Sequence, residues 1–111
     1  MSGELSQEAV CSSYGCEFLP PQEDDVLGIA LSTLEQTPLN ALRHEPQNGK
    51  CGWYVWGGEY SDLPDFFQPL HVHHLATHAP QLIPFLGLPP SWRALLAPGH
   101  CDVWRDQGLL S

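Results

Sequence analysis

The sequence contains few basic residues. It has four Lys and Arg against thirteen Asp and Glu, which gives a formal net charge of −9 over 111 residues. A protein that binds nucleic acid needs a basic stripe to displace counterions from phosphates, so this shortage argues against DNA or RNA as a partner. It argues equally against docking on an anionic membrane. A basic protein is the natural complement of such a charge, and the alternative is that the charge serves solubility alone.

Several sequence signals are also missing. No run of about 18 apolar residues occurs, so no transmembrane helix is expected. Residues 1–9 carry Glu4 and Glu8 without a basic residue, which argues against a secretory signal and favours a cytoplasmic location. The Gly57-Gly58 pair lacks the Lys and Ser/Thr of a phosphate-binding loop, and no serine lies in a Gly-x-Ser-x-Gly motif. We therefore expect a protein without a cofactor that is not an enzyme.

The four cysteines do not form a recognisable metal or redox motif. Cys11 and Cys16 are five residues apart, unlike the two-residue gap of a zinc ribbon or a redox pair. Cys51 and Cys101 lie in apolar stretches, which favours burial. In a reducing cytosol all four are expected to be free thiols.

The composition is that of one folded domain. Apolar residues make up 42% of the chain, which is enough for one hydrophobic core at this length. We expect residues 1–8 to be frayed and residues 9–111 to form a single domain. The predicted fold class is α+β, with an antiparallel sheet packed by two or three helices in a single compact domain.

Local patterns predict the order strand, helix, strand, helix, strand, strand. Three acids before an apolar run at helical spacing predict a helix over 24–36, and Asp65 with Gln68 forms a capping-box pattern that predicts a helix over 65–79. Residues 39–48 are expected to be irregular. The remaining expected elements are strand segments at 9–11, 14–19, 51–56, 92–96 and 101–104, and a short helical turn at 81–86. Trp92 and Trp104 in the last two strands are expected in the core.

The expected helix over 65–79 is rich in histidine. His71, His74 and His78 fall within roughly 60° of one another on a helical wheel, while His73 points away. The i, i+4 spacing of His74 and His78 suits two ligands of one metal ion. One alternative is therefore a small metal-binding protein or metal-dependent enzyme built on His71, His74 and His78. The other is a polar helix face without metal, since no glutamate follows His74 to complete a metalloprotease motif.

Aromatic residues cluster around the strand expected at 51–56. Alternation places Trp53 and Val55 on one face of that strand and Tyr54 and Trp56 on the other. Aromatic side chains beside acids are typical of protein-binding surfaces, where the aromatics are anchors and the acids set association rate and specificity. The candidate partner-binding residues are Trp56, Glu59, Tyr60, Asp62, Glu23, Asp24 and Asp25.

Five segments of the chain resemble a family of small bacterial proteins. They are Asn40–Pro46, Cys51–Glu59, Asp65–Leu75, Leu86–Arg93 and Asp102–Trp104. The resemblance covers roughly residues 26–110, and its most specific part is Gly52–Glu59. The similar proteins are domains of unknown function, several of which look like immunity proteins encoded beside polymorphic or secreted toxins. They carry a glycine where this chain has Ser91.

The resemblance implies an immunity protein that neutralises a cognate toxin by direct contact. A toxin that cuts nucleic acid must be basic at its substrate groove, so an acidic inhibitor can cover that groove as a phosphate mimic. The expected partner is therefore a basic nuclease effector delivered by the secretion system of a neighbouring cell. An adaptor for a secreted effector is a further interpretation.

Overall fold

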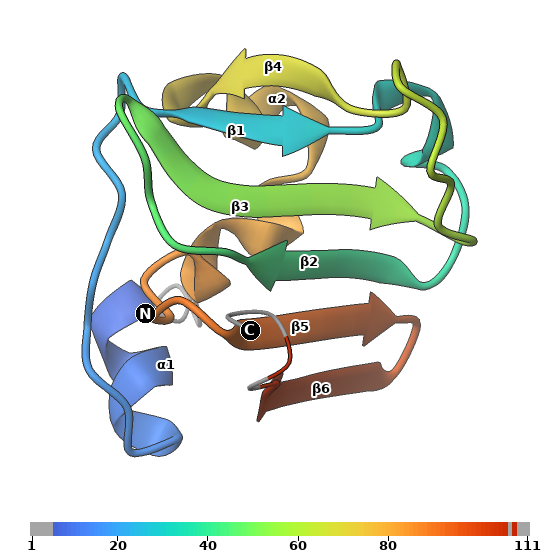
Figure 1. The fold of residues 1–111 in the computed structure, drawn as a ribbon. Helices are drawn as coiled ribbons and strands as arrows, with labels where there is room; N and C mark the ends of the chain where they lie inside the picture. The colour runs from blue at the N-terminus through green and yellow to red at the C-terminus, as the bar shows by residue number, and fades with distance from the viewer. Residues whose placement is uncertain (1–5, 107, 109–111) are drawn as a thin grey trace.

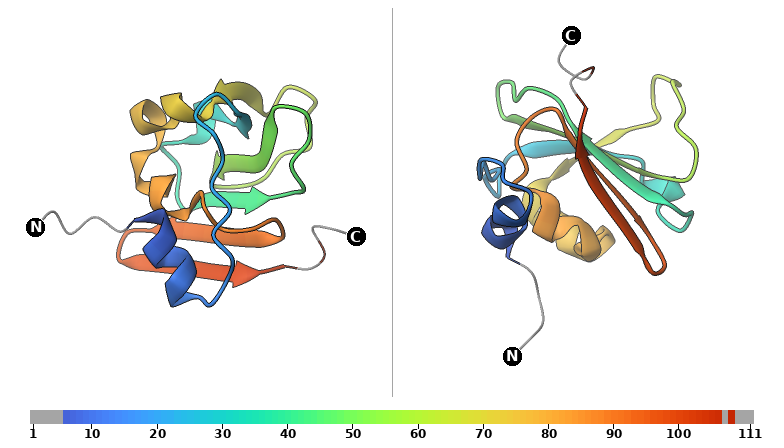
Figure 2. Two further views of the ribbon diagram at one scale, coloured as in Figure 1. Left: turned by 90° about the vertical axis from the view of Figure 1, so that its left-hand side faces the viewer. Right: turned by 90° about the horizontal axis from the view of Figure 1, so that it is seen from below.

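The computed structural model describes residues 6–106 and residue 108. A six-stranded sheet forms its centre, and short helical segments lie on one side of this sheet (Figures 1 and 2). The elements in chain order are α1 (Gln7–Ser13), β1 (Val26–Ile29), η1 (Leu31–Thr33), β2 (Leu39–Arg43), β3 (Lys50–Gly57), β4 (Gln68–His71), η2 (Val72–His74), α2 (Leu75–His78), η3 (Pro80–Phe85), β5 (Trp92–Ala97) and β6 (His100–Arg105). Most of the regular structure is sheet, so the predicted α+β class describes the fold only coarsely.

The sheet is mixed rather than antiparallel. Its strand order is β4-β1-β3-β2-β5-β6. β1 runs parallel to β3, and the other neighbouring pairs are antiparallel. The expectation of a purely antiparallel sheet was wrong because a helix had been predicted where β1 lies. A strand at that position joins β3 only after a crossover connection, which allows the parallel pairing.

The helix predicted over 24–36 is absent, and its first half forms strand β1. Leu27 and Ile29 point into the core, and β1 is hydrogen-bonded on both sides, to β3 and to β4. The acids that resembled a helix start form a turn, in which a side-chain oxygen of Asp25 accepts a hydrogen bond from the Gln22 amide at 2.9 Å. The apolar run is short, and helical and strand periodicity are poorly distinguished over so few residues.

The N-terminal strands predicted at 9–11 and 14–19 are also wrong, because residues 7–13 form helix α1. The Ser6 hydroxyl caps this helix by accepting a hydrogen bond from the Ala9 amide at 3.0 Å. Val10 and Cys11 are its buried residues. Of the segment expected to be frayed, residues 1–5 lie outside the described residues.

Residues 39–43 were expected to be irregular but form β2, which is central in the sheet and buried at all five positions. The helix predicted over 65–79 is replaced by edge strand β4, the η2 turn and the single-turn helix α2. Gln68 does not cap a helix; its side-chain amide donates to the Asp65 carbonyl at 2.8 Å within a turn. Pro69 is tolerated in β4 because an edge strand leaves one row of backbone groups unpaired.

Three of the predicted elements are confirmed. β3 corresponds to the strand predicted at 51–56, and η3 corresponds to the helical turn predicted at 81–86. The β5–β6 pair corresponds to the hairpin predicted from the strands at 92–96 and 101–104. The core lies between the sheet and the helical segments, with Trp53, Ile29 and Leu75 among its most buried side chains. None of the described helices combines the length and the hydropathy that a membrane span requires.

Buried Arg43 joins the sheet to the segments that pack against it. Its guanidinium donates to the carbonyls of Cys51, Leu19 and Leu88 at 2.6–2.9 Å and lies over the Trp53 ring. These bonds connect β2 and β3 with the chain before β1 and the chain after η3. Burial lowers the pKa of Arg43 from its ordinary value, because the charged form loses its hydration.

Candidate protein-binding face

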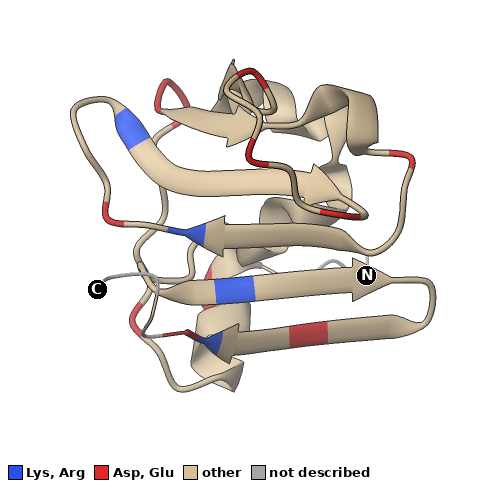
Figure 3. Ribbon diagram, turned by 45° about the vertical axis from the view of Figure 1, so that its right-hand side comes forward, with Lys and Arg blue, Asp and Glu red and all other residues tan. Residues whose placement is uncertain are grey.

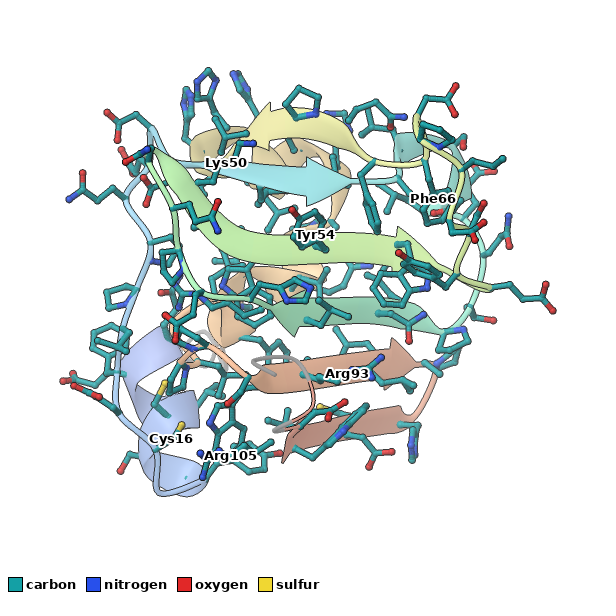
Figure 4. All side chains as sticks on the ribbon, viewed as in Figure 1. Cys16, Lys50, Tyr54, Phe66, Arg93 and Arg105 are labelled. Atoms are coloured by element: carbon teal, nitrogen blue, oxygen red, sulfur yellow. The ribbon has the colours of Figure 1, made fainter. Side chains whose placement is uncertain are left out.

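The helical segments leave the opposite face of the sheet uncovered. Trp53 and Val55 point into the core, as the alternation along β3 predicted, whereas Tyr54 and Trp56 lie on the opposite face. Figure 4 shows Tyr54 on β3 and Arg93 on β5, both in front of the sheet in this view. We call this side of the sheet the uncovered face.

Five aromatic rings pack together on the uncovered face. Residues 58–67, here called the acidic loop, connect β3 to β4 and bring three of these rings over the end of β3. We call the group the aromatic cluster; its members are Tyr54, Trp56, Tyr60, Phe66 and Phe67. Ring centroids are 5.1 Å apart for Tyr54–Phe67, 5.3 Å for Trp56–Tyr60 and 4.9 Å for Phe66–Phe67, all with edge-to-face geometry.

The cluster presents its residues to solvent unequally. Trp56 is only 4% exposed, because Tyr60 and Phe67 pack against it. Tyr60 is 60% exposed. Of the two aromatic residues singled out in the sequence, Tyr60 is therefore the one in direct reach of a partner, and Trp56 is the support beneath it.

Two glycines permit close approaches in and beside the aromatic cluster. A Cβ at Gly57 would overlap the Thr33 carbonyl oxygen, so the chain passes η1 here only because no side chain is present. A Cβ at Gly28 would lie 2.7 Å from the Tyr54 ring. The missing side chain of β1 therefore leaves room for the Tyr54 ring on the uncovered face.

A groove of about 600 Å³ runs over β1 and β3, lined among others by Val26, Gly28, Lys50, Tyr54 and Gln68. A second hollow of about 450 Å³ is lined by Leu42, His44, Tyr54, Trp56, Tyr60 and Phe67. Tyr54 lines both hollows, so its ring lies between them. The uncovered face is therefore not flat but offers concave, partly aromatic surface.

Acidic residues lie at both ends of β1. Figure 3 shows that most of the described Asp and Glu lie in loops, with Asp102 on β6 an exception, whereas Lys50, Arg93 and the other described basic residues lie on strands. Glu59, Asp62 and Asp65 are exposed in the acidic loop beyond the end of β1. Glu23–Asp25, here called the acidic run, precedes the start of β1. The predicted binding residues thus form two groups separated by the length of β1, with the groove between them.

The other end of the uncovered face carries a second aromatic feature. Arg93 lies 5.3 Å from the centre of the Trp104 ring and forms a 3.2 Å ion pair with Asp106. Trp104 was expected in the core, but it is 36% exposed because its position in β6 faces the same side as Arg93. Trp92 is half-buried and packs against the main core.

Phe66 and Phe67 were not identified from the sequence, since they were assigned to the start of a helix. A signal was present, because two adjacent phenylalanines next to an acidic loop are too apolar for a solvent-exposed first turn. Leu42 and His44 were missed for a different reason: residues 39–48 were not recognised as containing a strand. His44 packs edge-on against Tyr54, with 5.5 Å between ring centroids.

The histidines are arranged differently from the prediction. His71, His73 and His74 come together, and one ring nitrogen of each lies within 4.8 Å of the others. His73 therefore belongs to the group from which it was excluded, whereas His78 does not. The cause is the replacement of the continuous helix by a strand end and a 3₁₀ turn, which changes the direction of successive side chains.

Three of the thiols have raised pKa values. Burial raises the pKa of Cys11 to about 11, with Cys16 as a secondary cause, and burial also raises the pKa of Cys51. Partial desolvation, with Asp102 as a secondary cause, raises the pKa of Cys101. A thiol that stays protonated is a poor nucleophile, so these three side chains are unsuited to covalent catalysis. All four cysteines are free; Cys51 is buried as predicted, but Cys101 is exposed.

Comparisons with known proteins support the resemblance noted in the sequence. Searches of curated proteins and of solved structures gave no significant match. A family model described as Imm33-like domain matches residues 6–106, which include every strand and helix described above. Immunity-protein families of this kind are generally non-enzymatic. The chain therefore belongs to the Imm33-like domain family.

Proposed function

We propose that this chain is a cytoplasmic immunity protein that neutralises a cognate toxin by binding it through the uncovered face. The observation that supports this proposal is the aromatic cluster, which lies on the side of the sheet without helices and is bordered by exposed acids. Membership of the Imm33-like domain family points to the same class of function. The proposed toxin is a basic nuclease.

The aromatic and acidic residues would make different contributions to binding. Tyr60 and the partly exposed Phe66 and Phe67 offer rigid apolar surface, which gives affinity when it is desolvated. The carboxylates of Glu59 and Asp62 attract a basic groove and occupy the positions of substrate phosphates there. Charges mainly raise the association rate, and aromatic anchors mainly slow dissociation. The uncovered face would therefore bind the toxin quickly and release it slowly.

The proposal is tested with the protein encoded in the reading frame next to the gene for this chain, which we expect to carry a basic nuclease domain. The domain is expressed in cells with and without the chain, and growth is measured. The purified proteins are then mixed, and nuclease activity and complex formation are followed. We expect growth only in the presence of the chain, a stable complex, and loss of nuclease activity in proportion to the complex formed.

The binding face is tested with a charge-reversal pair. Glu59→Lys with Asp62→Lys should weaken toxin binding at least tenfold, because both acids lie beside the aromatic cluster. Glu8→Lys with Glu17→Lys is the matched control, since it changes the net charge equally at two other exposed positions, one of them in α1. Equal loss of affinity in both variants would contradict a localised interface. A complex that leaves the toxin active would instead support an adaptor.

A further inference from the structure

We propose that His71, His73 and His74, here called the histidine cluster, bind one divalent transition-metal ion of the zinc type. The three side chains are exposed, and each offers a ring nitrogen within 4.8 Å of those of the other two. Imidazole nitrogen is a preferred ligand of zinc, copper and nickel. This site lies outside the aromatic cluster and does not depend on the proposed toxin binding.

The fold holds the backbone of the cluster in place. His71 is the last residue of β4 and pairs with Val26 in β1. The amides of Val72 and His73 donate hydrogen bonds to the carbonyls of Asp25 and Glu23 at 2.9 and 3.1 Å. Two consecutive amides of the turn that carries the histidines are therefore hydrogen-bonded to the acidic run. A metal ion would meet a preformed arrangement rather than a mobile loop.

The geometry is close to that of a metal-bound set. Zinc binds imidazole nitrogen at about 2.0–2.1 Å, so two ligand nitrogens of a tetrahedral site lie about 3.3 Å apart. The ring nitrogens that the three histidines offer lie within 4.8 Å of one another, which exceeds this spacing by at most about 1.5 Å. Because all three side chains are exposed, rotation about their side-chain torsions can close this difference without repacking the core.

The electrostatic setting also favours a cation. Glu23 and Asp24 are exposed in the acidic run, whose backbone carbonyls anchor the turn, so the cluster lies next to a negatively charged segment. Three protein ligands leave a fourth position for water. Because the ligands are exposed and lie within four consecutive residues, the ion is not needed to hold the fold together.

The test uses the full chain without an affinity tag, titrated with zinc chloride in a calorimeter. We expect one equivalent of zinc to bind saturably. His71→Ala, His73→Ala and His74→Ala should each weaken zinc binding at least tenfold, since each removes one of three ligands. His78→Ala is the matched control and should change the affinity less than twofold, because His78 lies outside the cluster.

Circular dichroism confirms that each variant is folded, and cobalt(II) serves as a second probe. The parent chain should develop the intense visible absorption bands of tetrahedrally coordinated cobalt(II). These bands should be lost in His73→Ala. Absence of saturable binding would overturn the proposal. It would also be overturned by a loss in His78→Ala as large as in His73→Ala, because that result would place the ion on a His74–His78 pair.

Discussion

Ser91 occupies a backbone conformation that is unfavourable for any residue except glycine. Its φ is 80°, and it is the only residue other than glycine with positive φ among those described. Its amide donates to the Arg43 carbonyl at 2.8 Å, and its carbonyl accepts from the Asp106 amide at 2.6 Å. These two bonds hold the start of β5 beside β2 and the end of β6, so the conformation is imposed by the sheet.

Replacing Ser91 by glycine should therefore stabilise the protein. The left-handed region costs a side-chain-bearing residue about 1–2 kcal/mol, while glycine costs about 0.5–1 kcal/mol in unfolded-state entropy. We expect Ser91→Gly to raise the free energy of unfolding by about 0.5–1 kcal/mol, measured by urea denaturation. Ser91→Ala keeps a Cβ and is the control. A gain of the same size with alanine would show that strain at φ is not the cause.

Cys11 links stability to alkaline pH. Its pKa is raised by burial, and secondarily by Cys16, from 9.0 to about 11, so the folded protein holds the thiol proton more tightly than the unfolded chain does. The stabilisation from this protonated thiol is complete below pH 9, and it is lost as the pH rises through the pKa that Cys11 has in the folded protein. We expect the free energy of unfolding to fall between pH 9 and pH 11, measured by denaturant titration at several pH values.

The matched control for this pH dependence is Cys11→Ala. The substitution lowers stability at every pH because the side chain is buried, but the slope above pH 9 should be smaller than in the parent chain. Identical slopes in the two proteins would assign the alkaline loss of stability to other groups.

At the scale of elements, the acidic loop is an exposed connection held by its own aromatic residues. Tyr60 packs against Trp56 at 5.3 Å and Phe66 at 5.8 Å between ring centroids, yet most of its surface remains in solvent. A binding partner that covers this ring removes apolar area from water without first reorganising the loop. Low reorganisation cost is what makes an exposed aromatic residue an effective anchor.

Tyr60→Ala should therefore weaken toxin binding by about 2 kcal/mol while changing the free energy of unfolding little. Leu63→Ala is the matched control, since Leu63 is 63% exposed in the same loop but does not belong to the aromatic cluster. Trp56→Ala should instead lower the free energy of unfolding by about 3 kcal/mol, because Trp56 is buried. Calorimetric binding and urea denaturation separate the two effects. Equal toxin affinity for Tyr60→Ala and the parent chain would remove this loop from the interface.

Some strands could be predicted from the sequence and others could not, and the difference has a physical reason. β3 and the β5–β6 hairpin were predictable because their aromatic and β-branched residues alternate locally and a Pro98-Gly99 turn joins the hairpin. β1 was not predictable, because its identity as a strand depends on hydrogen bonds to β3 and β4, which are distant in sequence. The local sequence pattern of these four residues, which favoured a helix, was overridden by the tertiary contacts.

The candidate site was predictable to a similar extent. Alternation along β3 correctly separated Tyr54 and Trp56 from the core residues. Burial of Trp56 could not be foreseen, because it results from the acidic loop folding back on the sheet. The separation of Glu23–Asp25 from Glu59 and Asp62 likewise follows from the direction of β1, which the helix prediction had concealed. Sequence patterns thus identified residue types, but strand topology decided which of them meet.

At the scale of the whole molecule, the sequence has a net charge of −9, and most of the acidic residues that the structure describes lie in loops rather than on strands. An approaching basic protein therefore experiences attraction before contact, and this attraction is screened as the Debye length falls from about 30 Å at 0.01 M salt to about 8 Å at 0.15 M. We expect the association rate with the toxin to decrease over this range, measured by stopped flow, while the dissociation rate changes much less. An association rate independent of salt would contradict charge complementarity.

The parallel pairing of β1 with β3 has a consequence for how the chain reaches its native state. β1 is made early but inserts between β3 and β4, which are completed only at residues 57 and 71. While the chain is being synthesised, β1 therefore has no neighbouring strand to pair with, whereas β5 and β6 can pair directly because only a short turn separates them. Pairings between distant segments form slowly because long loops must close first. β1, which lies between edge strand β4 and β3 in the finished sheet, is thus expected to dock late, and a nascent chain ending before β4 would leave one edge of β1 open to other proteins.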